Sequence, residues 1–349
     1  MSQHAPVPLP PFDTREPDRL MGAIGDWITS PPLTELVARF AGVPTGSRQA
    51  AGSGSRSGAG FSSRSGSRQA AGARDLLAML DELVAFSAEH WDFRHGAERH
   101  EARRRRFDGS TEAAITDAAK ALGLAGHETP LLDRYDHVLI LGGMARACLG
   151  RTRYAHEVLR SVDAGTVSAI GGYRPLTTEE RDLTARFDGA CRYEVDALAL
   201  GLRRAFGGDA PTGTAGGDPD VDPRTAWCSV RIACPGDIPL WAVAAPSGEP
   251  DTRRANTADT CRFWAEHVAN LTGGERVLIV TSAIYVPFQH CDAIATIGLP
   301  YDCAVETVGH DPSLMDDDLR QEPPTADRYL QELRSALRSM RRLAGLIEA

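Results

Sequence analysis

The sequence has almost no lysine and no excess of positive charge. Lys120 is the only lysine, so 37 of the 38 Lys and Arg residues are arginines, and the formal net charge is −9 at pH 7. A general nucleic-acid binder needs a positive face that neutralises phosphates. We therefore expect no nucleic acid among the partners, whereas a local basic patch for a small anionic ligand stays open.

Cysteine pairs with the spacing of a metal or disulfide motif are missing as well. The seven cysteines are scattered, and no two of them have CxxC spacing. Free thiols in a reducing compartment explain this pattern better than a disulfide or zinc framework. No window reaches the ~18 apolar residues of a membrane span, and the first residues lack the pattern of a secretion signal. We expect a cytoplasmic protein without a metal site or a membrane partner.

The chain divides into three parts by composition. Residues 1–16 are proline-rich and are predicted to form a disordered arm. Residues 17–130 have the apolar spacing of a helical module, which a Gly-, Ser- and Arg-rich stretch at 45–72 interrupts. In that stretch the heptapeptide GSRQAAG occurs twice, and we predict a disordered insertion. Residues 131–349 are expected to form an α/β domain with a C-terminal helix.

The α/β prediction depends on short, continuous apolar runs that alternate with helical patterns. These runs lie at 137–141, 166–170, 229–233, 240–244, 276–280 and 304–308. Buried strands of this kind are typical of a Rossmann-like, mostly parallel sheet with helices on both faces. Ligands of such sheets bind outside the carboxyl ends of the strands, so side chains that follow the runs are the candidate site.

Two of the predicted strands end in a pair of glycines. Gly142-Gly143 is followed by Arg146, and Gly171-Gly172 is followed by Arg174. Glycines let a backbone approach a ligand closely, and the start of a following helix offers N–H groups to an anion. We therefore interpret all six residues as ligand-binding. A tight strand-to-helix turn is the alternative explanation.

Two predicted helices begin with polar residues at the same edge. Glu194 opens one of them and is a candidate for proton transfer, and Asn256-Thr257 opens another and is a candidate for ligand binding. Capping of the helix and interaction with its dipole explain such residues equally well.

The most chemically suggestive segment follows the run at 276–280. Thr281 and Ser282 end the strand, and Tyr285 and His290 follow within one loop and helical turn. His290 and Ser282 join Glu194 as catalytic candidates, with Thr281 and Tyr285 as hydrogen-bonding ligands. No GxSxG motif surrounds Ser282, which gives little support to a triad hydrolase.

In the helical module, Trp91 and Arg94 stand beside further charged residues. An aromatic ring next to an arginine suits stacking and anion recognition, so both are candidate ligand-binding residues. A salt-bridge cluster at a helix end or between domains is the alternative that we favour.

In order and spacing, these motifs resemble the YdcF/SanA/ElyC-like family (domain of unknown function 218). The similarity covers about residues 135–311 and depends on the two diglycines, Glu194, Asn256-Thr257 and Thr281-Ser282. The resemblance implies a Rossmann-like fold and a pocket for a small, phosphorylated or nucleotide-like ligand, without a settled reaction.

These observations lead to two functional hypotheses. The first is an enzyme that acts on a small anionic or nucleotide-like metabolite, and a hydrolase and a transferase, including one that uses S-adenosylmethionine, both fit. The second is a non-catalytic metabolite-binding or regulatory protein. The sequence identifies neither a cofactor nor an oligomeric state.

Overall fold

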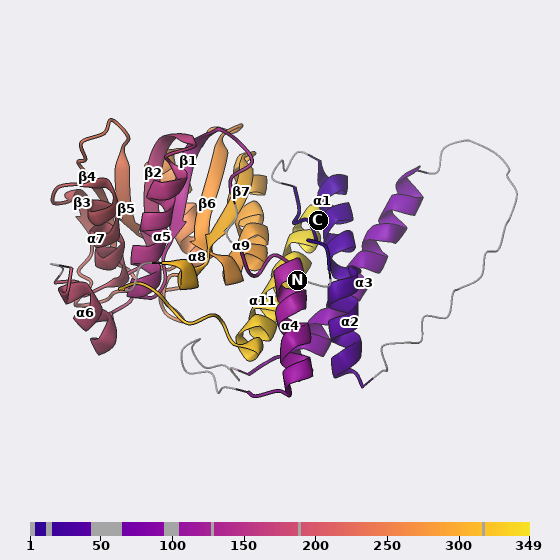
Figure 1. Ribbon diagram of the computed structural model, residues 1–349. Helices are drawn as coiled ribbons and strands as arrows, with labels where there is room; N and C mark the ends of the chain where they lie inside the picture. The colour runs from indigo at the N-terminus through magenta and orange to yellow at the C-terminus, as the bar shows by residue number, and fades with distance from the viewer. Residues whose placement is uncertain are drawn as a thin grey trace, which may run out of the picture.

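The computed structural model describes residues 4–11, 16–42, 65–93, 105–126, 129–187, 190–315 and 318–349, with side chains of the third range from residue 72 onward. These residues form an α/β unit and a helical bundle that lie side by side (Figure 1). None of the helices in these ranges has the length and apolar character that a membrane crossing requires.

A single seven-stranded sheet forms the centre of the described α/β unit, in the order β3-β4-β5-β2-β1-β6-β7. The last five strands of this order are parallel, whereas β4 is antiparallel to both of its neighbours. The predicted mostly parallel α/β sheet is therefore confirmed. The strands are β1 (Arg134–Leu141), β2 (Asp163–Gly171), β3 (Thr212–Gly216), β4 (Trp227–Ile232), β5 (Leu240–Ala244), β6 (Arg276–Ser282) and β7 (Ala304–His310).

The sequence pattern missed one strand, β3. Its residues read TGTAG and are exposed or partly exposed along the whole strand. An edge strand without large apolar side chains shows neither the continuous nor the alternating pattern on which the other strands were recognised. Only its pairing with β4 identifies it.

The order of the strands places a topological switch point between β1 and β6. The chain runs from β1 through β2 to β5 on one side, and then returns to build β6 and β7 on the other side of β1. Crevices at the carboxyl ends of two such strands are where open α/β sheets bind ligands. The residues that follow β1 and β6 are therefore the ones to inspect.

Helices cover both faces of the sheet. On one face, α5 and α7 pack against the central strands over a core that includes Val138, Ile140 and Leu198. On the other face, α8 and α9 pack over Leu139 and Ile279, because successive side chains of a strand point to opposite sides. The helices of this unit are α5 (Ala145–Val158), α6 (Thr178–Ala185), α7 (Glu194–Phe206), α8 (Thr257–Trp264), α9 (Val286–Ala293) and α10 (Leu299–Tyr301).

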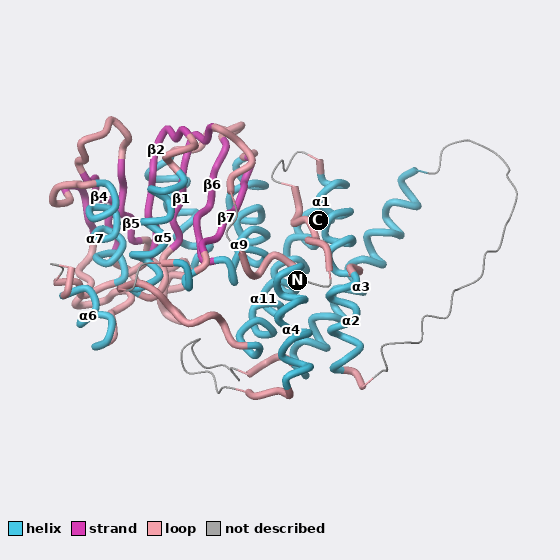
Figure 2. The backbone as a smooth tube through the Cα atoms, in the orientation of Figure 1, coloured by secondary structure: helices cyan, strands magenta, loops and turns pink. Residues whose placement is uncertain are grey.

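The C-terminal helix belongs to the bundle as much as to the sheet. It packs against α9 on one side and against α3 and α4 on the other, which Figure 2 shows as a helix between the two parts. Its buried Leu333 and Leu337 join the same core as Leu20 and Trp27 of α1. The bundle helices are α1 (Pro17–Ile28), α2 (Pro31–Phe40), α3 (Ser65–His90), α4 (Gly109–Ala121) and α11 (Ala326–Glu348).

Two segments that we expected to be disordered are partly ordered in the structure. Within the predicted N-terminal arm, the Val7 amide donates to the Ala121 carbonyl at 2.7 Å, and Pro10 is buried. Apolar side chains in this arm pack on the core. The sequence analysis missed this contact because the high proline content of the arm suggested disorder. Helix α3 begins at Ser65, so the last residues of the expected insertion are helical, and its residues 45–64 lie outside the described ranges.

Candidate functional site

Glu194 lies at the centre of the carboxyl edge, with its carboxyl group against both diglycine turns. It is the first residue of α7, and only 14% of its side chain is exposed. A Cβ atom at Gly142 would collide with Oε1 of Glu194, and one at Gly171 would press on its carboxyl carbon. The glycines therefore make room for this glutamate, a role that the sequence alone did not indicate.

Arg174 connects the two turns with the acidic groups. Its Nε lies 3.8 Å from Oε2 of Glu194, and one of its terminal nitrogens donates to the Gly143 carbonyl at 2.8 Å. The same guanidinium binds both carboxylate oxygens of Glu180, at 2.8 and 2.9 Å. Arg174 thus lies at this edge of the sheet and is held by protein groups on several sides, and its role in ligand binding stays a prediction.

Glu180 is a site residue that the sequence analysis missed. Its carboxylate accepts hydrogen bonds from the amide of Ala145, the first residue of α5, at 2.7 Å and from the Thr177 amide at 2.9 Å. Burial alone would raise the pKa of Glu180, but these bonds and the Arg174 guanidinium lower it. A protein carboxylate therefore occupies the start of α5, where we had expected a ligand anion. The signal was the Thr-x-x-Glu capping box at 177–180.

The protonation of Glu194 is set by opposing effects. Burial raises its pKa to about 7, against the lowering influence of Arg174, Arg151 and Arg254. The neighbouring Glu180 carboxylate adds to the rise. A carboxyl group with this pKa exchanges its proton near neutral pH, which is what a general acid or base requires.

Arg151 is the second site residue that the sequence analysis missed. It lies on α5 with 2% of its surface exposed, and it donates to the carbonyls of Leu141, at 2.7 Å, and Gly142. Its Nε donates to Oγ of Ser282 at 3.2 Å, and its guanidinium lies 5.6 Å from the ring centroid of Tyr285. Arg151 therefore joins the carboxyl ends of β1 and β6 at the switch point. Its spacing from Cys148 and Ala155 placed it on the apolar face of its helix, and that was the available signal.

The polar cluster predicted at 281–290 is divided between the two faces of the sheet. Ser282 points to α5 and Arg151, whereas Thr281 points the opposite way and binds Gln289 of α9. His290 is 3% exposed, and its ring contacts Oγ1 of Thr307 and the carbonyl of Pro10. Thr281 and Ser282 face opposite sides because successive residues of a strand do so, and His290 lies on α9 and packs on the same side as Thr281.

The other predicted residues at the edge are held by local contacts. Arg146 is bonded to the Asp318 carbonyl, and Gly172 packs near Ala255. Asn256 accepts from the amide of Asp259 at 3.0 Å and so caps α8, of which Thr257 is the first residue.

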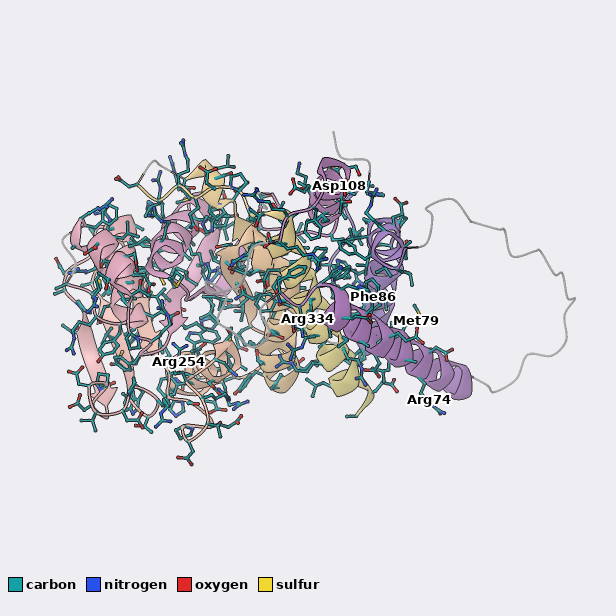
Figure 3. The ribbon with its side chains drawn as sticks, turned by 90° about the horizontal axis from the view of Figure 1, so that it is seen from below. Arg74, Met79, Phe86, Asp108, Arg254 and Arg334 are labelled. Atoms are coloured by element: carbon teal, nitrogen blue, oxygen red, sulfur yellow. The ribbon has the colours of Figure 1, made fainter. Side chains whose placement is uncertain are left out.

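The predicted site residues of the helical module do not join this edge. Trp91 is fully buried in the bundle core, and the adjacent Asp92 pairs with Arg334 of α11 at 2.9 Å. Figure 3 shows Arg334 in the bundle and Arg254 on the α/β unit. Asp92 therefore takes part in a salt bridge, which was the alternative explanation for this segment. Arg94 lies outside the described residues.

Comparison with known proteins corrects the family that the motifs suggested. The family model that matches is the Rv3785 N-terminal domain, over residues 63–123. The chain does not match the YdcF/SanA/ElyC-like family, so that resemblance was wrong. The resemblance depended on the two diglycines. In this structure they accommodate the Glu194 side chain, which explains them without a ligand site in common with that family. No solved structure matches the chain significantly.

Comparison with individual proteins indicates the same family. The chain is 35% identical over 242 residues to "Uncharacterized protein Rv3785" of Mycobacterium tuberculosis (strain ATCC 25618 / H37Rv) and, by the same measures, to "Uncharacterized protein Mb3814" of Mycobacterium bovis. Each alignment covers 68% of this chain and 67% of the relative. With this identity over two thirds of both chains, the protein belongs to the Rv3785 family.

Proposed function

We propose that this protein is an enzyme that acts on a small anionic metabolite at the carboxyl edge of its sheet, with Glu194 transferring the proton. The observation that carries the proposal is the enclosed carboxyl of Glu194, with a pKa of about 7, beside Arg174. A buried acid tuned to neutral pH at a topological switch point has the chemistry and the location of a catalytic group. Ser282 and Tyr285, which both contact Arg151, would supply hydrogen-bonding groups.

The charge balance of the site favours an anionic substrate. Three guanidinium groups, those of Arg151, Arg174 and Arg254, act on Glu194, against the carboxylate of Glu180. The groups that act on Glu194 thus include more positive than negative charges. Because Glu180 already occupies the start of α5, a small anion fits this arrangement better than a dinucleotide that needs this helix end for its diphosphate. The proposal is therefore a small anion in general, and a nucleotide-like substrate is only its narrower form.

The second candidate is a non-catalytic metabolite-binding or regulatory protein. The observation in its favour is that Arg174 and Arg151 are held in place by hydrogen bonds to backbone carbonyl oxygens. Cationic groups in fixed positions suit a site that binds an anion without reacting with it. Either function would operate in the cytoplasm under this proposal, because the seven cysteines are free thiols.

Turnover of small anionic metabolites tests the assignment. The wild-type protein is incubated with an anion-exchange fraction of a metabolite extract, and depletion of each compound is followed by mass spectrometry. For Glu194→Gln we expect turnover lower by ~10²-fold or more, the usual contribution of a general acid or base. Glu306→Gln is the matched control, because Glu306 is also a buried carboxyl, and it is bonded to Tyr135 away from the arginine cluster. Native mass spectrometry of the purified protein reports whether a ligand is carried along.

The outcomes separate the candidates. Turnover by Glu194→Gln at the wild-type rate would contradict the role of Glu194. A wild-type protein that binds an extracted metabolite and never converts it would support the second candidate.

A further inference from the structure

The carboxyl group of Glu194 is surrounded by ionisable groups from four other segments. Arg151 and the thiol of Cys148 come from α5, Arg174 from the loop after β2, Glu180 from α6 and Arg254 from the loop after β5. Burial raises the pKa of the Cys148 thiol to about 12, so it stays neutral over the physiological range. The charged partners of Glu194 are thus three guanidinium groups and one carboxylate.

Glu194 and an anionic substrate would use the same positive charge. The ionised carboxylate already lies 3.8 Å from the Arg174 guanidinium, and Arg151 and Arg254 act on it too. An anion bound by these arginines would add a second negative charge to an enclosed cluster, where like charges repel strongly. Protonation of Glu194 removes that repulsion. The arginines can then interact with the anionic ligand instead of with the Glu194 carboxylate.

We propose that the site takes up a proton with each anion that it binds, and that Glu194 accepts this proton. The inference rests on the proposed function, since it requires an anion at these arginines. The inference adds that binding of the substrate itself protonates Glu194. The negative charge of the anion favours the protonated form, so Glu194 changes from a carboxylate into a proton donor next to the substrate.

The dependence on pH has a defined sign. Below its pKa of about 7, Glu194 is already protonated, so anion binding needs no further proton. Above that value the carboxylate must first be protonated, and the affinity for anions therefore falls as the pH rises. If binding requires the protonated form, linkage gives a loss of about tenfold in affinity between pH 6 and pH 8. Reciprocally, a bound anion raises the pKa of Glu194 further.

Isothermal titration calorimetry with sulfate measures this coupling directly. Sulfate does not titrate in this range, so any proton that appears in the measurement belongs to the protein. Titrations at pH 7.5 in HEPES and in Tris, which differ in ionisation enthalpy, give the number of protons bound per sulfate. We expect about 0.8 protons for the wild-type protein at pH 7.5, and a value near zero at pH 6.

Variants identify the group and the place. Glu194→Gln should bind sulfate with no proton uptake and with an affinity that does not change with pH. Glu306→Gln should keep the wild-type uptake, because burial also raises the pKa of Glu306 but its partners are Tyr135 and Leu131. Arg174→Gln should weaken sulfate binding by at least tenfold, which places the sulfate at this cluster.

The results distinguish this inference from the proposed function. Sulfate that binds through Arg174 without proton uptake would refute the inference and leave the anionic site intact. A wild-type protein that binds no sulfate at pH 6, or binds it equally well after Arg174→Gln, would overturn the anionic site and the inference together.

Discussion

At the scale of single residues, burial moves the pKa values of Glu194 and His290 in opposite directions. It disfavours the charged form of each group, and so raises the pKa of the acid to about 7 and lowers that of His290 to about 4. The two groups lie on different faces of the sheet, Glu194 at the start of α7 and His290 on α9. We propose a chemical role for the first, whereas the second is part of the packing.

His290 should make the fold sensitive to acid. Its pKa is about 4 when folded and near 6.5 when unfolded, so the unfolded chain binds the proton more readily and stability is lost as the pH falls through this interval. The loss is roughly 3 kcal/mol by pH 4. Urea unfolding at pH 4.5 and pH 7.5 should show a smaller acid loss for His290→Gln than for the wild-type protein.

A matched comparison corrects for Glu194, which has the opposite effect. Its folded pKa lies above the unfolded value, so its contribution to stability is present at low pH and is lost as the pH rises from about 4.5 to 7. Measuring His290→Gln in the Glu194→Gln background removes this contribution. An unchanged acid loss in that background would show that His290 does not titrate as its burial indicates.

At the scale of elements, the helices at the carboxyl edge are capped by carboxylates of the chain itself. Glu180 closes the start of α6 and binds the first amide of α5, Asp196 accepts from the Tyr193 amide at α7, and Asp259 completes the capping box of α8. Two of the sequence motifs that we interpreted as a site lie at these helix starts, Glu194 at α7 and Asn256-Thr257 at α8. Side-chain guanidinium groups are the positively charged donors that act on Glu194, which is why the proposed site depends on arginines.

Asn256 tests the distinction between a cap and a ligand. Asn256→Ala should lower the free energy of unfolding by about 1 kcal/mol, because the Asp259 amide loses its acceptor. Sulfate affinity should stay within about twofold of the wild-type value, since the side chain serves the helix. Thr257→Ala, one position further on, is the control and should change stability by less than about 0.5 kcal/mol. A tenfold loss of sulfate affinity in Asn256→Ala would restore its role as a ligand.

At the scale of the molecule, the bundle and the sheet share one hydrophobic core. Trp27 and Leu333 of the bundle belong to the same cluster as Leu139, Ile279 and Trp264 under the sheet. Helix α11 connects the two because one side packs on α9 and the other on α3 and α4. We therefore expect the two parts to unfold together.

Leu333→Ala should test this cooperativity. Leu333 is fully buried, so its truncation should cost ~3 kcal/mol. Hydrogen exchange should show similar losses of protection in α1 and β1. Leu346→Ala in the same helix is the control, since Leu346 is 51% exposed and its loss should cost less than about 0.5 kcal/mol. Loss of protection in α1 with β1 unchanged would mean that the two parts unfold separately.

The sequence by itself determined the strands with continuous apolar runs, the parallel sheet that their alternation with helices requires, and the polar groups at its carboxyl edge. These features follow from local pattern, because a buried strand must be apolar and its connection must cross over a face. Glu194 and Arg174 were proposed as site residues in this way.

Only the tertiary structure decided which groups meet. The fold brings Glu194 into the space left by two glycines, sends Ser282 and Thr281 to opposite faces, and pairs the inconspicuous Arg151 with both central strands. It also draws the C-terminal helix into the bundle and makes a strand of TGTAG. These outcomes depend on partners far away in the sequence, whose positions are fixed by strand order and packing and leave no local pattern to read.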